Sequence, residues 1–200
     1  MRAGWRSGRV AIEAAKVNAQ GDAVTDDEFW AVIDAGGARA KADGDRHFAA
    51  VRKALLKLPP AQVCDFERHL WERLTELYTK RMWGAGSLVN GGCSDDGFDY
   101  FRCWVIGQGR AVYEAAVRDP DTLAGHLDLD DGNEREWEEL LVVAGQVYEE
   151  QTGGEMPDDG EPGPGYADFS AEDNKWDFGD DAENARRLPR LWAIYGDGNG

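Results

Sequence analysis

The side chains best suited to chemistry lie close together between residues 91 and 109. Carboxylates are ligands that Mg²⁺ and Ca²⁺ prefer, and an arginine can hold an anionic ligand. The sequence therefore predicts a candidate ligand-binding or structural motif made of Ser94, Asp95, Asp96, Asp99, Arg102 and Trp104. In its metal form, a divalent cation would bind among Asp95, Asp96 and Asp99.

The same motif also has a structural interpretation. A glycine pair at 91–92 permits a sharp turn, and Ser94 can cap a helix that begins after it. The helix dipole favours acidic residues in the first turn, and Asp99 can pair with Arg102 at a spacing of three residues. The sequence leaves both interpretations open: a ligand site, or residues that cap and fix a helix.

Helices must position this motif, because apolar residues recur every three or four positions up to residue 150. A capping box at Thr25 and Glu28 predicts the first helix. Further helices are expected over 45–58, 61–82, 94–106, 110–117 and 134–150, the last of the core, with a small, flexible stretch over 84–92. The predicted fold class is all-α: a single helical domain of five to six helices with an acidic, irregular C-terminal tail.

Three regions differ in composition. We expect a flexible N-terminal extension over 1–24, the helical domain over 25–153, and an acidic tail rich in Pro and Gly with aromatic anchors over 154–200. Residues 155–183 hold eleven carboxylates and one lysine, a local charge of −10 out of the net −17. Such a tail either folds on binding a partner or packs its rings, among them Trp176, back onto its own helices.

One stretch resembles a known family. The run GGCSDDGFDYFRCWVIGQGR over 91–110, followed by Val112-Tyr113-Glu114 and Asp119-Pro120-Asp121, is similar to a bacterial domain-of-unknown-function family, number 4240. The resemblance covers roughly residues 25–157. Because the family is named for its lack of an assigned activity, it implies no catalytic residues for this chain.

The net charge of −17 excludes some classes of function. An acidic surface repels phosphates, so we expect no direct nucleic-acid binding and no binding to anionic membranes. The sequence has no apolar run of the length that a transmembrane helix or a signal peptide needs, which predicts a cytoplasmic location. Cys64, Cys93 and Cys103 have no metal-ligand spacing, so packed, reduced thiols are expected.

Two hypotheses for the function follow. The first is a non-enzymatic protein-interaction or regulatory module, similar to an immunity protein or antitoxin, whose acidic tail contacts a basic protein partner. The alternative is a metal- or anion-binding enzyme domain with a pocket formed by the Ser-Asp-Asp-x-x-Asp-x-x-Arg motif, joined by Tyr113 or Glu114. No cofactor is evident from the sequence, and a divalent cation is the one that the alternative hypothesis would use. The first is favoured because no nucleophile and base pair can be identified.

Overall fold

The computed structural model describes residues 23–35, 37, 44–127, 135–157 and 176–196. In chain order its helices are α1 (Asp26–Ile33), α3 (Gly44–Leu55), α4 (Pro60–Glu76), α5 (Lys80–Val89), α6 (Asp95–Gly107), α7 (Arg110–Arg118), η2 (Pro120–Gly125), η3 (Glu138–Leu141), α8 (Val143–Thr152), α9 (Asp181–Arg187) and α10 (Pro189–Tyr195), where η marks a 3₁₀ helix. The described residues contain no strand, which confirms the all-α class. The helices are more numerous than the five or six expected.

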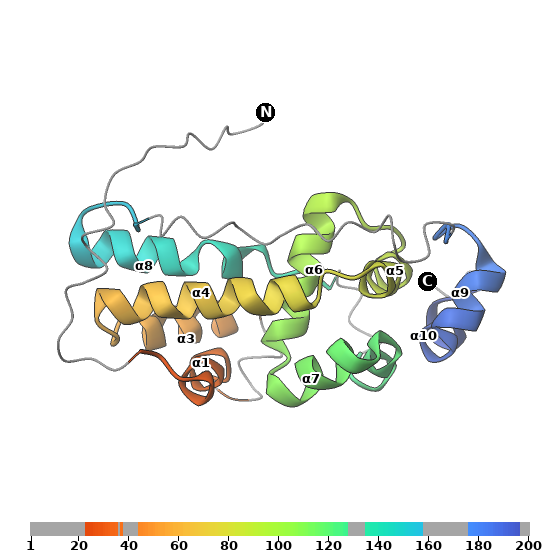
Figure 1. The fold of residues 1–200 in the computed structure, drawn as a ribbon, viewed down its shortest axis with the longest axis horizontal. Helices are drawn as coiled ribbons and strands as arrows, with labels where there is room; N and C mark the ends of the chain where they lie inside the picture. The colour runs from red at the N-terminus through yellow and green to blue at the C-terminus, as the bar shows by residue number, and fades with distance from the viewer. Residues whose placement is uncertain (1–22, 36, 38–43, 128–134, 158–175, 197–200) are drawn as a thin grey trace.

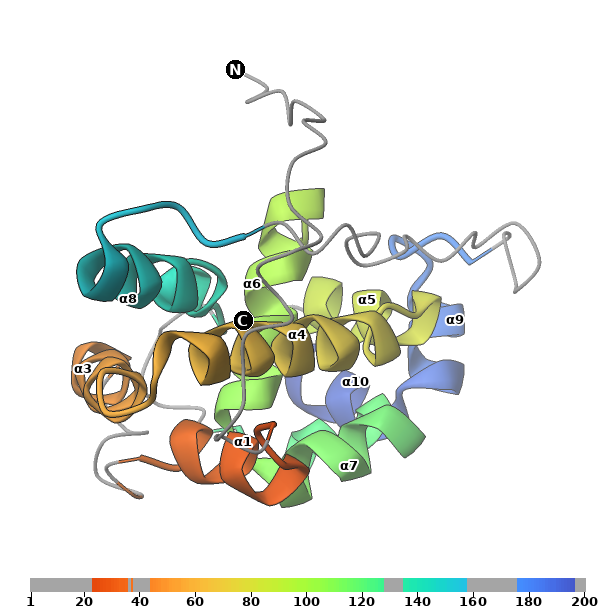
Figure 2. The same cartoon turned by 60° about the vertical axis from the view of Figure 1, so that its left-hand side comes forward.

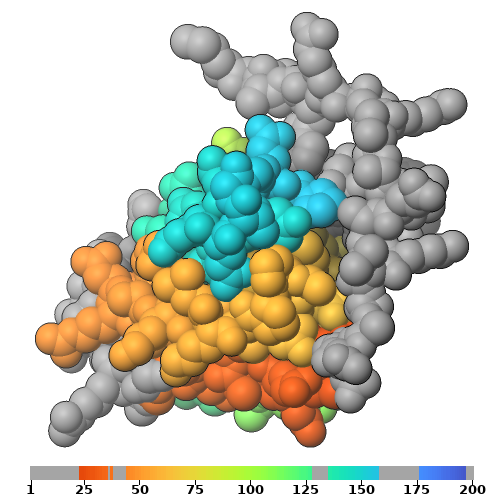
Figure 3. Space-filling view, turned by 90° about the vertical axis from the view of Figure 1, so that its left-hand side faces the viewer, coloured from red at the N-terminus to blue at the C-terminus, as the bar shows by residue number. Residues whose placement is uncertain are grey.

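Helix α4 runs along the centre of the molecule (Figures 1 and 2). Helices α8 and α1 pack against it, α3 lies against both α8 and α1, and α6 crosses it steeply. The end of the molecule formed by α3, α4 and α8 is closely packed in Figure 3, with α1 along its lower edge. The opposite end is made of α5, η2, α9 and α10.

The core is apolar because α4 buries one face over its full length. Val63, Phe66, Leu70 and Leu74, spaced three or four residues apart, are at most 1% exposed. Pro59 precedes the helix and Pro60 occupies its first turn, where a missing N–H costs nothing. The described helices include none with the length and apolar character needed to cross a membrane.

The helix expected over 61–82 is in fact two helices. Helix α4 ends at Glu76, and α5 begins at Lys80 after Thr79, whose side chain accepts a hydrogen bond of 3.1 Å from the backbone N–H of Met82. The prediction was wrong here because the break contains neither glycine nor proline. The hydroxyl of Thr79 instead satisfies one of the free donors at the new helix start.

The prediction of a flexible stretch over 84–92 was also wrong. Residues 84–89 are the greater part of α5, and the glycines among them allow close packing instead of mobility. A Cβ at Gly84 would lie 2.2 Å from the Trp176 indole, and one at Gly86 would lie 2.9 Å from the Phe101 ring. The two glycines therefore let aromatic rings approach the helix backbone.

In the C-terminal part of the chain, residues 181–187 and 189–195 form helices. Residues 135–137 are not helical, η3 and α8 replace the single helix expected over 134–150, and α9 and α10 follow it. Trp176 is 3% exposed, and α9 and α10 pack on α5. The tail is thus helical over 181–187 and 189–195 and irregular over 176–180, and its Trp176 ring packs onto α5 of the same chain. The expectations for 1–22 and 158–175 lie outside the described residues.

Candidate functional site

The predicted motif forms the start of α6. Gly91 and Gly92 have positive φ angles of 68° and 139°, which glycine adopts without strain. The side chain of Ser94 then accepts a hydrogen bond of 3.1 Å from the backbone N–H of Gly97. Asp95 and Asp96 are exposed in the first turn, where the helix dipole stabilises their negative charge.

Arg102 is the buried centre of the motif. Its side chain is 1% exposed, and its central guanidinium carbon lies 4.8 Å from the ring centre of Tyr78 and 4.9 Å from that of Phe98. One terminal nitrogen donates a hydrogen bond of 2.5 Å to the carbonyl oxygen of Leu74, and the other pairs with Asp99. Because the carbonyls of the last helical turn lack partners within the helix, Arg102 ties α6 to the end of α4.

Of the six predicted motif residues, the structure brings Asp99 and Arg102 together as an ion pair. Trp104 is half-buried and stacks on Phe101, with ring centroids 5.9 Å apart. Within the described part of the chain, no group of three or more His, Cys, Asp and Glu side chains could hold a metal ion. The divalent cation among Asp95, Asp96 and Asp99 stays a prediction from the sequence alone.

Nor do the thiols beside the motif resemble activated nucleophiles. Burial, together with the nearby carboxylates of Glu136 and Asp99, raises the pKa of Cys93 to about 12. Burial also raises the pKa of Cys103 above its usual range. Because the thiolate is the nucleophile, both cysteines are held in their unreactive form at neutral pH.

A pocket of about 270 Å³ lies elsewhere, between α1, α4 and α7. Its lining residues are Asp26, Trp30, Glu72, Arg73, Glu76, Tyr113 and Glu114. Of these residues, the sequence indicated only Tyr113 and Glu114 as members of a candidate site, and it grouped them with the α6 motif. The structure instead places them opposite α1 and α4. The acidic pair Glu72 and Glu76, one helical turn apart on α4, was the sequence signal that could have indicated this face.

Three local features position the lining. The capping box of α1 forms as expected: Thr25 and Glu28 exchange backbone-to-side-chain hydrogen bonds of 2.8 and 3.3 Å, which fixes Asp26 in the first turn. Glu72 and Glu76 lie in the last two turns of α4. Between α6 and α7 the chain turns at Gly109, whose φ of 94° requires glycine and sets the direction of α7.

Two arginines of the chain lie in or beside the pocket. The guanidinium of Arg73 lies 4.2 Å from the ring centre of Phe29 and 5.3 Å from that of Trp30, and it pairs with Asp26. Its other terminal nitrogen donates a hydrogen bond of 2.7 Å to a backbone carbonyl of α4. Arg110, at the rim, forms ion pairs of 2.7–2.9 Å with three carboxylates.

The pocket nevertheless keeps an excess of negative charge. Four carboxylates and one arginine line it, a formal charge of −3. The hydroxyl of Tyr113 donates a hydrogen bond to Glu76, and burial together with this bond raises the pKa of Tyr113, so the phenol stays neutral. Within the described residues Glu76 has no cation partner. The arrangement is suited to binding a positively charged group.

Comparison with known proteins defines the family. The family model of DUF4240, a protein of unknown function, matches residues 24–150. The chain belongs to the DUF4240 family. No curated protein and no solved structure gives a significant match. The match covers the α6 motif and the lining of the pocket, so both are features of the DUF4240 region of this chain, whereas α9 and α10 lie beyond it.

Proposed function

We propose that the protein is a non-enzymatic interaction module that recognises a basic partner protein through its acidic surface. The observation that carries the proposal is the pocket between α1, α4 and α7, where four carboxylates and two aromatic side chains surround a single arginine. Complementary charge speeds the encounter of two proteins and fixes their register. The net charge of −17 extends this attraction beyond the pocket.

The state of the α6 motif supports a binding role over a catalytic one. Ser94 caps a helix and Arg102 is buried in an ion pair. These two side chains, which could otherwise take part in a reaction, therefore stabilise the fold. The raised pKa values of Cys93 and Cys103 point the same way. We propose that this function is regulatory, of the immunity-protein or antitoxin kind, and that it is exerted in the bacterial cytoplasm.

The acidic tail belongs to the same proposal. Within it, the described residue Glu183 is already neutralised by Arg186 and Arg187, whose hydrogen bonds lower its pKa to about 2. Of the pocket carboxylates, Glu76 has no arginine partner within the described residues, so it is a better candidate for the first contact than Glu183. The remaining acidic positions of the tail, over 158–175, lie outside the described residues.

The test compares two triple variants of equal charge change. The pocket variant is Glu72→Gln, Glu76→Gln and Glu114→Gln, and the control is Asp95→Asn, Asp96→Asn and Glu139→Gln, on exposed positions away from the pocket. Tagged full-length proteins are used to isolate bound proteins from host cells, at low and high salt. We expect basic proteins to bind the wild type and the control variant at low salt. We expect this binding to be lost in the pocket variant and at high salt.

If both variants retain the basic proteins equally well, the pocket is not the site that binds them. Loss confined to the control variant would favour the alternative, a ligand site at the α6 motif. Circular dichroism of both variants must match the wild type, because an unfolded variant also loses its partners.

A further inference from the structure

We infer that the pocket between α1, α4 and α7 binds the guanidinium group of an arginine presented on a peptide of the partner. This inference rests on the proposed function and names the chemical group that the pocket recognises. It is carried by the spread of the carboxylates, by the way the protein holds its own arginines there, and by one unsatisfied buried donor.

The carboxylates of the pocket are spread around it instead of converging on a point. Four of them line it, yet none of the described residues form a group of three or more that could hold a metal ion. A guanidinium is planar and has five N–H donors arranged as a fork. It can reach carboxylates that are several ångströms apart, which a compact cation cannot.

The protein's own arginines show that this surface accommodates guanidinium groups. Arg73 lies over the rings of Phe29 and Trp30, and Arg110 is shared among the carboxylates of Asp26, Asp27 and Glu114. Stacking on a ring face and forked pairing with carboxylates are the two contacts that distinguish arginine from lysine. Trp30 and Tyr113 also line the pocket and lie against each other, with ring centroids 5.1 Å apart.

Two carboxylates retain accepting capacity. Glu76 accepts the hydroxyl of Tyr113 at Oε2, and Glu114 pairs with Arg110 at Oε1. The second oxygen of each has no partner within the described part of the chain. These two oxygens, one from α4 and one from α7, are the acceptors that we assign to the incoming guanidinium.

Arg73 provides an independent observation that favours a peptide over a simple cation. Its side chain is 10% exposed and lines the pocket, and its Nε has no hydrogen-bond partner within the described residues. A buried donor without an acceptor is unfavourable. A peptide brings backbone carbonyl oxygens together with its positive side chain, whereas a free metal ion brings only its charge.

The test uses the full-length protein, labelled with ¹⁵N, and N-acetyl-arginine amide as the probe. N-acetyl-lysine amide and Mg²⁺ serve as comparison ligands. We expect saturable shifts of backbone signals from α1, α4 and α7 on titration with the arginine probe, and weaker binding of the lysine probe. Glu76→Gln should raise the dissociation constant about fivefold, as expected for one partly exposed charge pair.

The matched control is Glu139→Gln, which makes the same chemical change outside the pocket lining. It should leave the dissociation constant unchanged. Glu114→Gln is a second pocket variant in case Glu76→Gln alters the fold, which circular dichroism reveals. The absence of saturable shifts, equal weakening by Glu139→Gln, or equal binding of the lysine probe would each overturn the inference.

The outcomes separate this inference from the proposed function. If basic proteins are still lost from the pocket triple variant but the arginine probe does not bind, the function stands and the assignment of a guanidinium fails. If the probe binds in the pocket but no basic protein depends on the same carboxylates, the ligand class stands and the proposed partner fails.

Discussion

Arg102 is as deeply buried as the phenylalanines beside it, although its guanidinium is charged. The side chain is acceptable in the core because the carbonyl of Leu74 and the carboxylate of Asp99 accept its terminal N–H groups. Its remaining nitrogen, Nε, has no partner within the described residues and lies in an aromatic environment. The ion pair lies within α6, and the carbonyl of Leu74 is the acceptor that joins it to α4.

We predict that Arg102→Leu lowers the free energy of unfolding by about 3 kcal/mol, because it leaves the carbonyl of Leu74 and the carboxylate of Asp99 without their donor. Urea denaturation followed by circular dichroism measures the change. The control Glu139→Gln, on an exposed position, should stay within about 0.5 kcal/mol of the wild type. A loss of under about 1 kcal/mol for Arg102→Leu would mean that the motif is not held by this pair.

The sequence could predict the local contacts of this motif but not its contact with α4. Ser94 and the pairing of Asp99 with Arg102 are local features, and both were expected from spacing alone. The carbonyl of Leu74 comes from another helix, and no local pattern indicates that it accepts from Arg102. Local spacing therefore cannot show the contact that joins this motif to α4.

At the scale of the elements, α5 shows how packing overrides local preference. Gly84 and Gly86 lie inside the helix, where each glycine disfavours the helix by about 1 kcal/mol relative to alanine. Close contact with Trp176 and Phe101 offsets this loss. The sequence predicted the helix starts at Thr25 and Ser94 well, but it missed the start of α5 after Thr79 and did not indicate the rings that pack on Gly84 and Gly86.

We predict that Gly84→Ala has opposite effects in two backgrounds. In the wild type it lowers the free energy of unfolding by roughly 1–3 kcal/mol, because the new Cβ collides with the Trp176 indole. In a Trp176→Ala background, which itself costs about 3 kcal/mol, the same change should stabilise by up to about 1 kcal/mol. Chemical denaturation of the four proteins measures the cycle. Equal effects in both backgrounds would contradict the contact.

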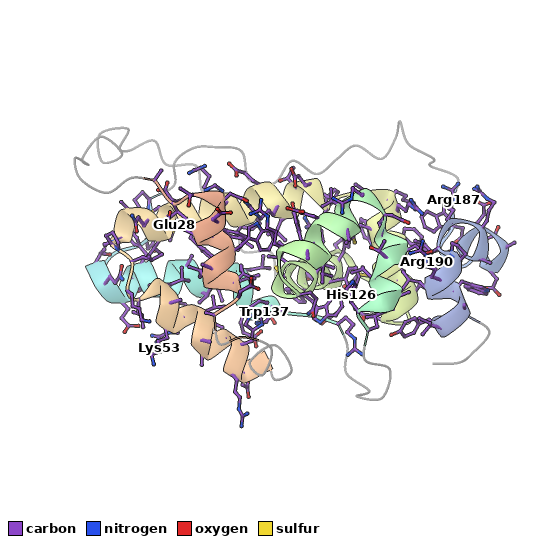
Figure 4. All side chains as sticks on the ribbon, turned by 90° about the horizontal axis from the view of Figure 1, so that it is seen from below. Glu28, Lys53, His126, Trp137, Arg187 and Arg190 are labelled. Carbon is purple, nitrogen blue, oxygen red and sulfur yellow. The ribbon has the colours of Figure 1, made fainter. Side chains whose placement is uncertain are left out.

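On the scale of the whole molecule, the C-terminal helices complete a surface of the DUF4240 region. The carboxylate of Asp121 is 2% exposed and accepts hydrogen bonds of 2.9–3.1 Å from the backbone N–H groups of Arg190 and Leu191. It thereby caps α10, which lies outside the family match. Figure 4 shows Arg187 and Arg190 at this end of the molecule, well apart from Glu28 on α1.

We predict that truncation after Gly153 lowers the free energy of unfolding by at least about 4 kcal/mol, because it removes the buried side chains Trp176, Leu188 and Leu191. Thermal unfolding measures the loss, and binding of a hydrophobic dye reports the exposed surface of α5 and η2. A truncated protein with the melting temperature of the full chain would contradict this packing. Substitution of individual tail carboxylates is therefore a cleaner test of the tail than its deletion.

The contact between Gly84 and Trp176 also bears on the order of events in folding. Helix α5 contains glycines that weaken it in isolation, and the indole that packs on Gly84 follows 92 positions later in the chain. A ribosome releases that indole only after the DUF4240 region has emerged. We therefore expect α5 to be completed late, so that a segment synthesised after the DUF4240 region finishes a helix near the middle of that region.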